Sequence, residues 1–370
     1  LTIQTNVTVA VAVNHLEFSN NRYYNMTQKK IKINSYTGFQ PLKSCIIGRS
    51  YPPEFYSKID NPKVRSALER VAVETEEDYQ KLIRLIESFG VQVYRPTIQD
   101  QNNFEEYMLI LENGQRWYQP PPMNPRDHLL VSGNNLFVNR PCGPTYVDFY
   151  DDIIAQIDGN VIHSRDYPEV QNLSGPSVTR VGRDIYFDTP NFQPNIIDRF
   201  FSQYQKRVIH TGGHSDAVFC PVTPGLIVSL RDVDTYADTF PGWEVVYLPG
   251  QSWDKVLPFL ELRQKNSGRW WIPGEEKNDS LVDFINVWLD QWVGYVEETV
   301  FDVNMLVIDE KNVICNNYNE ITFRAFERHG VTPHICNFRH RYFWDGGLHC
   351  VSLDLHRTGG MTDYFGSDET

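Results

Sequence analysis

Three segments of the sequence combine reactive polar side chains with residues that favour tight turns. They are 124–127 (Asn-Pro-Arg-Asp), 212–216 (Gly-Gly-His-Ser-Asp) and 345–350 (Asp-Gly-Gly-Leu-His-Cys). Each segment leads into a predicted strand. Binding and catalytic residues often lie on loops at one face of a rigid scaffold. We therefore expect the three segments to meet at one site.

The side chains in these segments are the ones that thiol catalysis requires. A thiolate is the nucleophile, and at neutral pH it needs a base or a cationic neighbour. Cys350 would supply the thiolate, and His214 would move the proton because imidazole titrates near neutral pH. A carboxylate such as Asp127 or Asp216 would orient the imidazole or hold a cationic substrate. The sequence therefore predicts a site built on cysteine, histidine and aspartate.

Other interpretations of these residue types compete with catalysis. A cysteine in a strand is usually a core residue, and we assign that role to Cys45, Cys220, Cys315 and Cys336. His210, His214 and Asp216 could bind a metal, as could His349 with Cys350. Neighbouring residues of a strand point to opposite faces, so His349 and Cys350 are poor partners for one ion. We therefore expect no metal.

A recurring unit surrounds these segments: a helix that often ends at glycine, a short strand, and a hairpin. The helices are expected at residues 63–89, 148–157, 195–205, 235–239 and 320–328, and the hairpins at 129–139, 178–187, 217–230 and 305–315. The last strand, 349–356, could pair with the early strand 44–48. Since one unit cannot bury its apolar face alone, the repeat favours a circular array of five units over a generic α/β sheet with hairpins.

Composition limits the class of protein. The 370 residues carry a net charge of −13, which argues against a broad nucleic-acid interface because phosphate binding needs a basic face. No apolar run reaches the roughly 18 residues of a membrane span, and residues 1–13 lack the basic flank of a signal peptide. Six cysteines without C-x-x-C spacing are typical of a reducing compartment. We expect a cytoplasmic protein with no nucleic-acid or membrane partner.

The chain divides unevenly. Residues 1–36 are rich in Asn, Thr and Tyr without clear periodicity, so we expect an N-terminal extension. Residues 37–365 would form a single catalytic domain. Two long segments, 97–123 and an insertion at 263–295, interrupt its units. Our hypothesis is that these two segments cover the site and exclude water.

The motifs resemble the amidinotransferase branch of the guanidino-group-modifying superfamily, and most of all the arginine:glycine amidinotransferases. The matching segments are 41–42 with 45–49, 90–96, 125–127 with 131–134, 180 with 182–185, 214–217 with 224–225 and 229, 304–310 with 319–320, and 346–350. Their order and spacing agree over roughly residues 37–360. The resemblance implies a five-bladed α/β propeller, a pseudo-five-fold ring in one domain.

The resemblance also implies a mechanism. Cys350 would be the nucleophile and His214 the general acid and base. Cys350 would attack the guanidinium carbon of L-arginine, and ornithine would leave. An acceptor amine would then take the amidino group from the cysteine in a two-step scheme. The resemblance implies no cofactor, and it implies a homodimer.

Substrate contacts carry over less completely. Asp127 and Asp216 would clamp the guanidinium by charge-assisted hydrogen bonds. Arg231 lies near the family's arginine, though at a different spacing, and would bind the donor carboxylate. The family places acidic residues where this sequence has Ser174 and Ser177, so Ser177 would be the substrate contact there. Glu169 is the nearby acid that could substitute.

Three functions remain open at this point. The first is an amidinotransferase whose acceptor could be glycine, ornithine, lysine, a polyamine or an amino sugar. The second is a guanidine hydrolase of the same superfamily, of the arginine deiminase or dimethylarginine hydrolase type, in which water takes the group. The third is an inactive guanidine-binding protein, which the two serines favour. The presence of Cys350, His214, Asp216 and Asp127 argues against the third.

Overall fold

The computed structural model describes residues 30–98, 108–110, 116–139, 148–188, 194–233, 235–250 and 253–366. Within these ranges, five three-stranded sheets share one design. In each, the middle strand pairs antiparallel with one neighbour and parallel with the other. The sheets are β19 (Ser352–Arg357), β2 (Leu42–Ile47) and β3 (Gln92–Tyr94); β6 (Leu129–Ser132), β7 (Asn135–Val138) and β9 (Asn160–His163); β10 (Val178–Val181), β11 (Asp184–Asp188) and β12 (Gln205–Ile209); β13 (Phe219–Thr223), β14 (Leu226–Ser229) and β15 (Glu244–Tyr247); β16 (Leu306–Asp309), β17 (Asn312–Cys315) and β18 (Thr332–Ile335).

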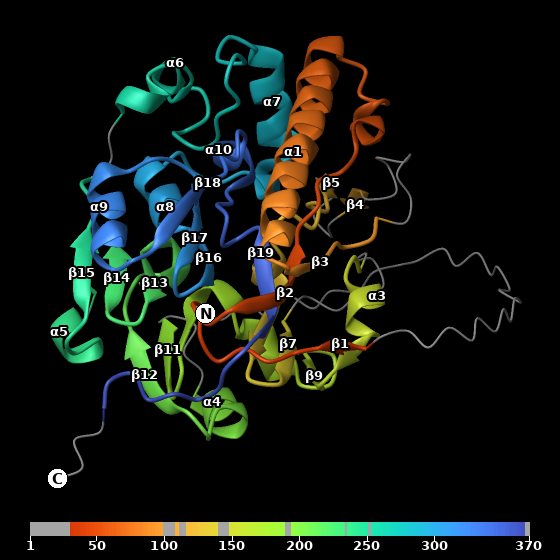
Figure 1. The fold of residues 1–370 in the computed structure, drawn as a ribbon. Coiled ribbons are helices and arrows are strands. Elements are labelled where there is room, and N and C mark those ends of the chain that lie inside the picture. The colour runs from red at the N-terminus through yellow and green to blue at the C-terminus, as the bar shows by residue number, and fades with distance from the viewer. Residues whose placement is uncertain are drawn as a thin grey trace, which may run out of the picture.

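The helices α4 (Pro194–Phe200), α5 (Tyr236–Thr239) and α9 (Glu320–Arg328) lie at the outside of the molecule (Figure 1). The predicted pairing of the last strand with an early one is confirmed, because β19 runs antiparallel to β2 with Leu353 opposite Ile46. One sheet is therefore made from both ends of the domain.

The predicted hairpins are confirmed, and the conformation of their turns explains why glycine occurs there. Gly133 joins β6 to β7 with a φ of 59°, and Gly182 joins β10 to β11 with a φ of 67°. Residues with a side chain rarely adopt this left-handed conformation, whereas glycine does so readily. The hairpins β13–β14 and β16–β17 likewise lie where the alternating pattern places them.

The long helix α1 (Pro62–Ser88) follows the sequence signals closely. Asn61 caps it, since its side chain accepts hydrogen bonds from the backbone N–H groups of Lys63 and Val64. Apolar residues at helical spacing, from Val64 to Ile86, face the core. Gly90, with a φ of 74°, ends the helical stretch.

Two predicted helices are shorter in the structure. α3 (Asp151–Ile154) stops because Ile157 already belongs to β8 (Ile157–Asp158), which pairs in parallel with β1 (Ile31–Lys32). α4 ends at Phe200 because β12 begins at Gln205, opposite Asp184. In both places sheet pairing takes residues that helical periodicity had assigned to the helix.

The described end of the expected N-terminal extension is part of the fold. Ile31 and Ile33 are buried in the main core, and Ser35 donates a hydrogen bond to Asp354 over 2.5 Å. The rest of the predicted extension, residues 1–29, lies outside the described residues.

The insertion forms a helical layer over one side of the sheets. It contains α7 (Asp279–Trp288), and it follows α6 (Phe259–Leu262) and precedes α8 (Glu298–Val303). α7 lies beside α1 (Figure 1), and its apolar residues join the same core cluster. Trp292 donates its indole N–H to the carbonyl of Tyr118 over 2.8 Å, which ties the insertion to the end of β5 (Arg116–Tyr118).

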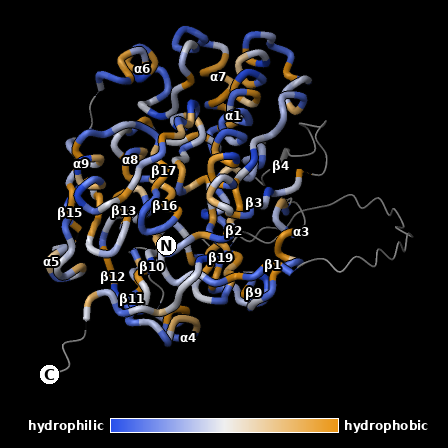
Figure 2. Tube along the Cα trace, in the orientation of Figure 1, coloured by the Kyte–Doolittle hydropathy of each residue, from blue (hydrophilic) through white to orange (hydrophobic). Residues whose placement is uncertain are grey.

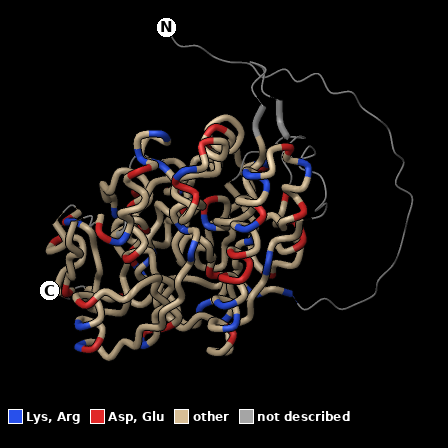
Figure 3. Tube along the Cα trace, turned by 90° about the horizontal axis from the view of Figure 1, so that it is seen from above, with Lys and Arg blue, Asp and Glu red and all other residues tan. Residues whose placement is uncertain are grey.

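Apolar residues concentrate in the strands and on the inner faces of the helices (Figure 2). Acidic and basic residues are interleaved over the molecule and do not gather on one basic face (Figure 3). No helix in the described part of the chain is both long enough and apolar enough to cross a membrane.

A buried ionic cluster lies where the sheets approach one another. Asp354 contacts Arg126 at 2.9 Å, Arg180 at 2.8 Å and Arg357 at 3.2 Å, and all four side chains are almost fully buried. Ser35 donates to the same carboxylate. Burial alone would raise the pKa of the Asp354 carboxyl, but the three arginines hold it well below its usual range. The cluster links α2 (Pro125–His128), β10 and β19.

Candidate active site

A cavity of about 260 Å³ brings together three of the predicted site residues, Asp127, His214 and Cys350. The other described residues that line it are Pro120, Pro121, Met123, Asn124, His128, Gln291, Trp292, Val293, Trp344 and Asp345. Its walls therefore include both segments that were expected to cover the site, 97–123 and 263–295. The convergence of the three motif segments on one site is confirmed.

The loop that carries Cys350 differs from the prediction. Cys350 lies in a turn between α10 (Arg341–Trp344) and β19, not within the last strand. Asn304 holds this turn: its Oδ1 accepts hydrogen bonds from the backbone N–H groups of His349, at 2.9 Å, and Cys350, at 3.1 Å. Its Nδ2 donates to the Cys350 Sγ over 3.1 Å. A Cβ on Gly347 would lie 2.6 Å from Asn304 Oδ1, so only glycine leaves room for the amide.

Asp216 supports this turn from behind. Its Oδ2 lies 2.7 Å from His349 Nδ1 and accepts from the Cys350 Sγ at 3.7 Å. His349 and Cys350 thus approach one carboxylate, whereas strand geometry had predicted opposite faces. Burial would raise the pKa of Asp216, but its hydrogen bond and attraction to His349 hold it below the usual range. Asp216 is therefore an anion, and its Oδ1 is buried without a partner among the described residues.

The surroundings of Cys350 disfavour a thiolate in the free protein. Burial raises the pKa of its thiol well above the usual value, and the charges of Asp216, Asp127 and Asp345 raise it further. A bound cation would offset these carboxylates. The geometry therefore suits a nucleophile that ionises when a cationic substrate enters.

Asp127 lies on α2 and is half-buried at the cavity wall. Burial raises the pKa of its carboxyl to about 7, with a further contribution from Asp216, although His214 opposes the shift. A guanidinium beside it would favour the ionised form. Asp127 is thus placed to bind a cation next to Cys350.

His214 is exposed in the cavity, on a loop that Asp188 organises. The Asp188 carboxylate, at the end of β11, accepts from the backbone N–H groups of Thr211, at 2.9 Å, and Gly213, at 3.2 Å, and from the Thr211 hydroxyl. On the other side of the loop, Ser177 donates to the Gly213 carbonyl over 2.6 Å. Sequence reasoning missed Asp188, because an acid at a strand end resembles an ordinary turn residue.

The remaining predicted contacts lie outside the described cavity. Ser177 lies beneath the Gly213 loop, and Arg231 donates to the carbonyl of Thr211 behind it. Their contact with substrate stays a prediction. Glu169 forms an ion pair with Arg199 at 3.1 Å near the surface, so it does not replace the family's acid. No described side chain hydrogen-bonds the imidazole of His214.

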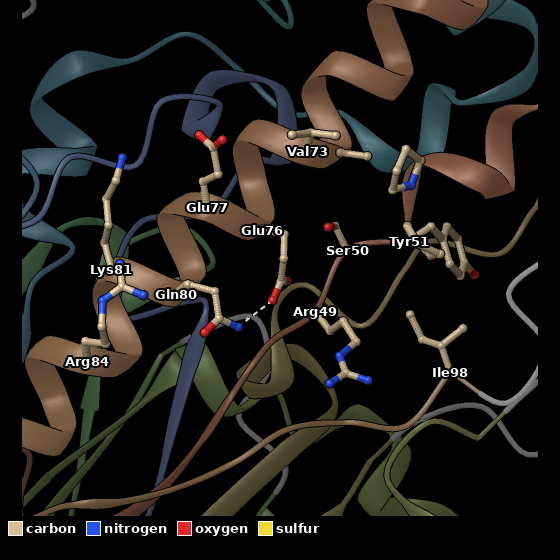
Figure 4. Close-up of a pocket in the computed structure, with 13 residues that line it drawn as sticks. Arg49, Ser50, Tyr51, Val73, Glu76, Glu77, Gln80, Lys81, Arg84 and Ile98 are labelled. Carbon is tan, nitrogen blue, oxygen red and sulfur yellow. Dashed lines mark hydrogen bonds between the residues drawn. The ribbon is translucent and has the colours of Figure 1, made fainter.

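A larger cavity, of about 660 Å³, lies between α1 and the segment after β2 (Figure 4). Arg49, Glu76 and Gln80 project into it, and Gln80 donates to Glu76 over 2.7 Å. None of the described residues that line it is a cysteine or histidine. The smaller cavity, which is lined by Cys350 and His214, is therefore the candidate active site.

No protein-family model matches the chain. It is 22% identical over 229 residues to the L-arginine:L-lysine amidinotransferase of Pseudomonas savastanoi pv. phaseolicola, covering 59% of this chain and 53% of that protein. It is 26% identical over 152 residues to the mitochondrial glycine amidinotransferase of Xenopus tropicalis, covering 41% and 28%. Inosamine-phosphate amidinotransferase 1 of Streptomyces glaucescens is 21% identical over 332 residues, covering 80% and 84%. The match thus spans about half of the length of the first relative and less than a third of the length of the second.

Two solved structures share the fold. SxtG, an amidinotransferase of the saxitoxin biosynthetic pathway from Microseira wollei, superposes with a TM-score of 0.62 at 18% identity over 90% of this chain and 99% of that one. StrB1, an inosamine-phosphate amidinotransferase from Streptomyces griseus, superposes with a TM-score of 0.61 at 16% identity. The match covers 91% of this chain and 100% of that one. Over about nine tenths of its length the chain therefore shares the propeller-like α/β fold of these two structures. In sequence the chain is similar to three amidinotransferases, each at 21–26% identity.

Proposed function

We propose that the protein moves the amidino group of L-arginine to an acceptor amine through a covalent amidino-cysteine on Cys350. The observation that carries the proposal is the single cavity in which Cys350, His214 and Asp127 meet, with Asp216 in contact with the sulfur. A planar cation can lie there between carboxylates with its central carbon facing the thiol.

The first half-reaction follows from this arrangement. Asp127 and Oδ1 of Asp216, which has no hydrogen-bond partner among the described residues, accept the guanidinium N–H groups, and their neutralised charge lets the Cys350 thiol pass its proton to His214. The sulfur attacks the guanidinium carbon and forms a C–S bond. The bond from that carbon to the ornithine nitrogen breaks, and His214 gives that nitrogen a proton. Ornithine leaves, and the amidino group stays on the cysteine.

The second half-reaction reverses these steps with a new amine. The acceptor nitrogen attacks the amidino carbon, and His214 takes its proton. The C–S bond breaks, and the sulfur takes the proton back from His214, which restores the thiol. No cofactor is required. Pro120, Pro121 and Trp292 form the wall that would keep water from the amidino-cysteine.

The wider organisation belongs to the same proposal. The five sheets of one design would be the blades of a pseudo-five-fold ring, formed by residues 37–365 and preceded by an extension over residues 1–36. The cavity would lie at one end of the ring's axis. We further expect a homodimer that works in the cytoplasm.

The relatives support the reaction and leave the acceptor open. Their names give L-arginine with L-lysine, glycine, and inosamine phosphate. One reaction type thus occurs with acceptors of different chemistry. The acceptor must therefore be decided by residues of the cavity wall.

The test is mass spectrometry of the intact protein after incubation with arginine alone. We expect a mass gain of one amidino group in the wild type, none in Cys350→Ala, and an unchanged gain in Cys220→Ala, whose thiol lies outside the cavity. Release of citrulline without any amine would show a hydrolase. Absence of both adduct and citrulline would overturn the proposal and favour a guanidine-binding protein.

A further inference from the structure

The cavity wall carries a carboxylate that the mechanism above does not use. Asp345 opens the Cys350 turn, and its side chain is accessible to solvent within the cavity. It lies close enough to raise the pKa of Cys350 and of Asp127 through its charge. The proposed mechanism assigns the guanidinium to Asp127 and Asp216. Asp345 therefore does not bind the guanidinium in the first half-reaction.

The backbone at Asp345 is held in an uncommon conformation. Its φ of 50° and ψ of 42° are left-handed, and only two other non-glycine residues of the described chain, Thr235 and Ser267, have a positive φ. Aspartate tolerates this region better than most residues, but glycine would adopt it without strain. Strain of this kind persists where the surrounding structure enforces it, often at ligand sites.

The insertion fixes the direction of the Asp345 side chain. A Cβ on Gly294 would lie 1.8 Å from the Asp345 Cγ, so only glycine at this position leaves room for the carboxylate. The backbone N–H of Tyr295 lies close enough to the same carboxylate to lower its pKa. The insertion and the Cys350 turn therefore fit together around one acidic group that faces the cavity.

The cavity wall carries negative charge, which favours the binding of cations. Asp127 and Asp345 line the cavity, and Asp216 lies behind the sulfur, whereas none of its described lining residues is a lysine or an arginine. Burial by the surrounding protein raises the pKa of the Asp345 carboxyl, although His214 opposes the rise. A cationic ligand beside Asp345 would therefore stabilise the ionised carboxylate.

We propose that Asp345 is a specificity-determining residue that binds an ammonium group remote from the reacting nitrogen, and that the acceptor is therefore an amine with a second cationic group, such as a diamine or a basic amino acid. This inference rests on the proposed amidinotransferase function. The neutral end of the acceptor attacks the amidino carbon on Cys350, and the other end stays protonated on Asp345. The same carboxylate would hold the α-ammonium of the leaving ornithine.

The first experiment offers two amines to the preformed amidino-enzyme, freed of arginine. Putrescine and butylamine differ only in the second ammonium group, and the loss of the amidino mass is followed over time. We expect transfer to putrescine to be at least about tenfold faster, in line with a hydrogen bond between charged groups. In Asp345→Asn, which keeps a side chain suited to the left-handed backbone, that preference should vanish while butylamine reacts as before.

A matched control removes a nearby charge outside the cavity. Glu297 is exposed and acts on Asp345 only at a distance, so Glu297→Gln should keep the wild-type preference. An equal preference in wild type and Asp345→Asn would overturn the inference while leaving the amidinotransferase proposal intact.

A binding measurement makes the inference independent of turnover. Calorimetry with the Cys350→Ala protein should show putrescine binding more tightly than butylamine, and adding Asp345→Asn should abolish the difference. If the wild type forms no adduct, the proposed function fails, yet this titration still decides whether Asp345 binds an ammonium group. Equal binding of both amines to Cys350→Ala would refute it.

Discussion

Cys350 has carboxylates for neighbours where many reactive thiols have a fixed cation. Burial raises the pKa of its thiol most, and the charges of Asp216, Asp127 and Asp345 raise it further. A thiol in such surroundings is protected from adventitious electrophiles while the cavity is empty. The positive charge that activates it must then arrive with the substrate.

The titration of Cys350 tests this account. We expect the thiolate absorbance of Cys350, taken as the difference between wild type and Cys350→Ser, to emerge only above the usual range for a cysteine. An unreactive alkylguanidine should move that titration to lower pH, because its charge offsets the carboxylates. A thiolate already present at neutral pH without ligand would contradict the prediction.

The fall in activity at low pH should reflect the protonation of Asp127. Its pKa is raised to about 7 in the free protein, so it is increasingly protonated below that pH and loses its attraction for a guanidinium. We therefore expect kcat/KM for arginine to fall as the pH drops below about 7, since this parameter reports groups of the free enzyme. A profile that stays flat from neutral pH into the acid range would exclude this role.

At the scale of elements, loops rather than strands position the chemistry. Asp188 holds the His214 loop on one side, and Ser177 holds it on the other. Asn304 holds the Cys350 turn. Each of these anchors lies on a different element from the residue it positions. A carboxylate that orders the backbone of the histidine loop takes the place of one that would contact the imidazole itself.

Asp188→Asn should lower kcat without unfolding the protein. The amide has one acceptor oxygen, so it cannot accept from the Thr211 N–H, which reaches Oδ1, and also from the Thr211 hydroxyl and the Gly213 N–H, which reach Oδ2. His214 would then lose its fixed position. We expect a loss of roughly 10- to 100-fold, the scale of a misplaced catalytic group. Steady-state kinetics and the reactivity of His214 with diethyl pyrocarbonate measure it.

The control for this variant is Asp198→Asn. It removes an exposed carboxylate that pairs with Lys206 and should leave kcat unchanged. If Asp188→Asn keeps full kcat and normal His214 reactivity, Asp188 has only a structural role.

Much of this architecture could be predicted from the sequence. Alternating apolar residues and turn glycines located the hairpins, and capping signals located α1, because these are local effects. The turn at Cys350 was assigned to a strand because its conformation depends on Asn304, which is 46 positions away. Asp188 escaped notice, and Asp345 was named only as the first residue of its motif, for the same reason: their roles depend on neighbours distant in the sequence, Gly213 and Gly294.

At the scale of the whole molecule, one buried aspartate holds three arginines from several elements together. Removing its charge leaves those guanidinium groups buried without an anion. We expect Asp354→Asn to lower the free energy of unfolding by about 3–5 kcal/mol, as for other broken buried pairs. Urea denaturation measures this. The more exposed pair of Asp363 with Arg183 provides the control, and Asp363→Asn should cost less than about 1 kcal/mol.

The same aspartate predicts the response to acid. The pKa of Asp354 is far lower in the folded protein than in the unfolded chain, where an aspartate titrates near about 3.9. Its contribution is therefore complete above that value and is lost as the pH falls further toward its folded pKa. Asp354→Asn should flatten the acid side of the stability profile. An unchanged acid slope would show that other carboxyl groups dominate.

The pairing of β19 with β2 has a consequence for the protein's synthesis on the ribosome. The sheet that begins near residue 42 stays incomplete until residues 352–357 have been made, and the nucleophile comes just before them. A nascent chain therefore carries most of its scaffold before it carries any reactive thiol in place. On the proposed mechanism, a chain that terminates before Cys350 would be inert, because it lacks both the thiol and the strand that completes this sheet.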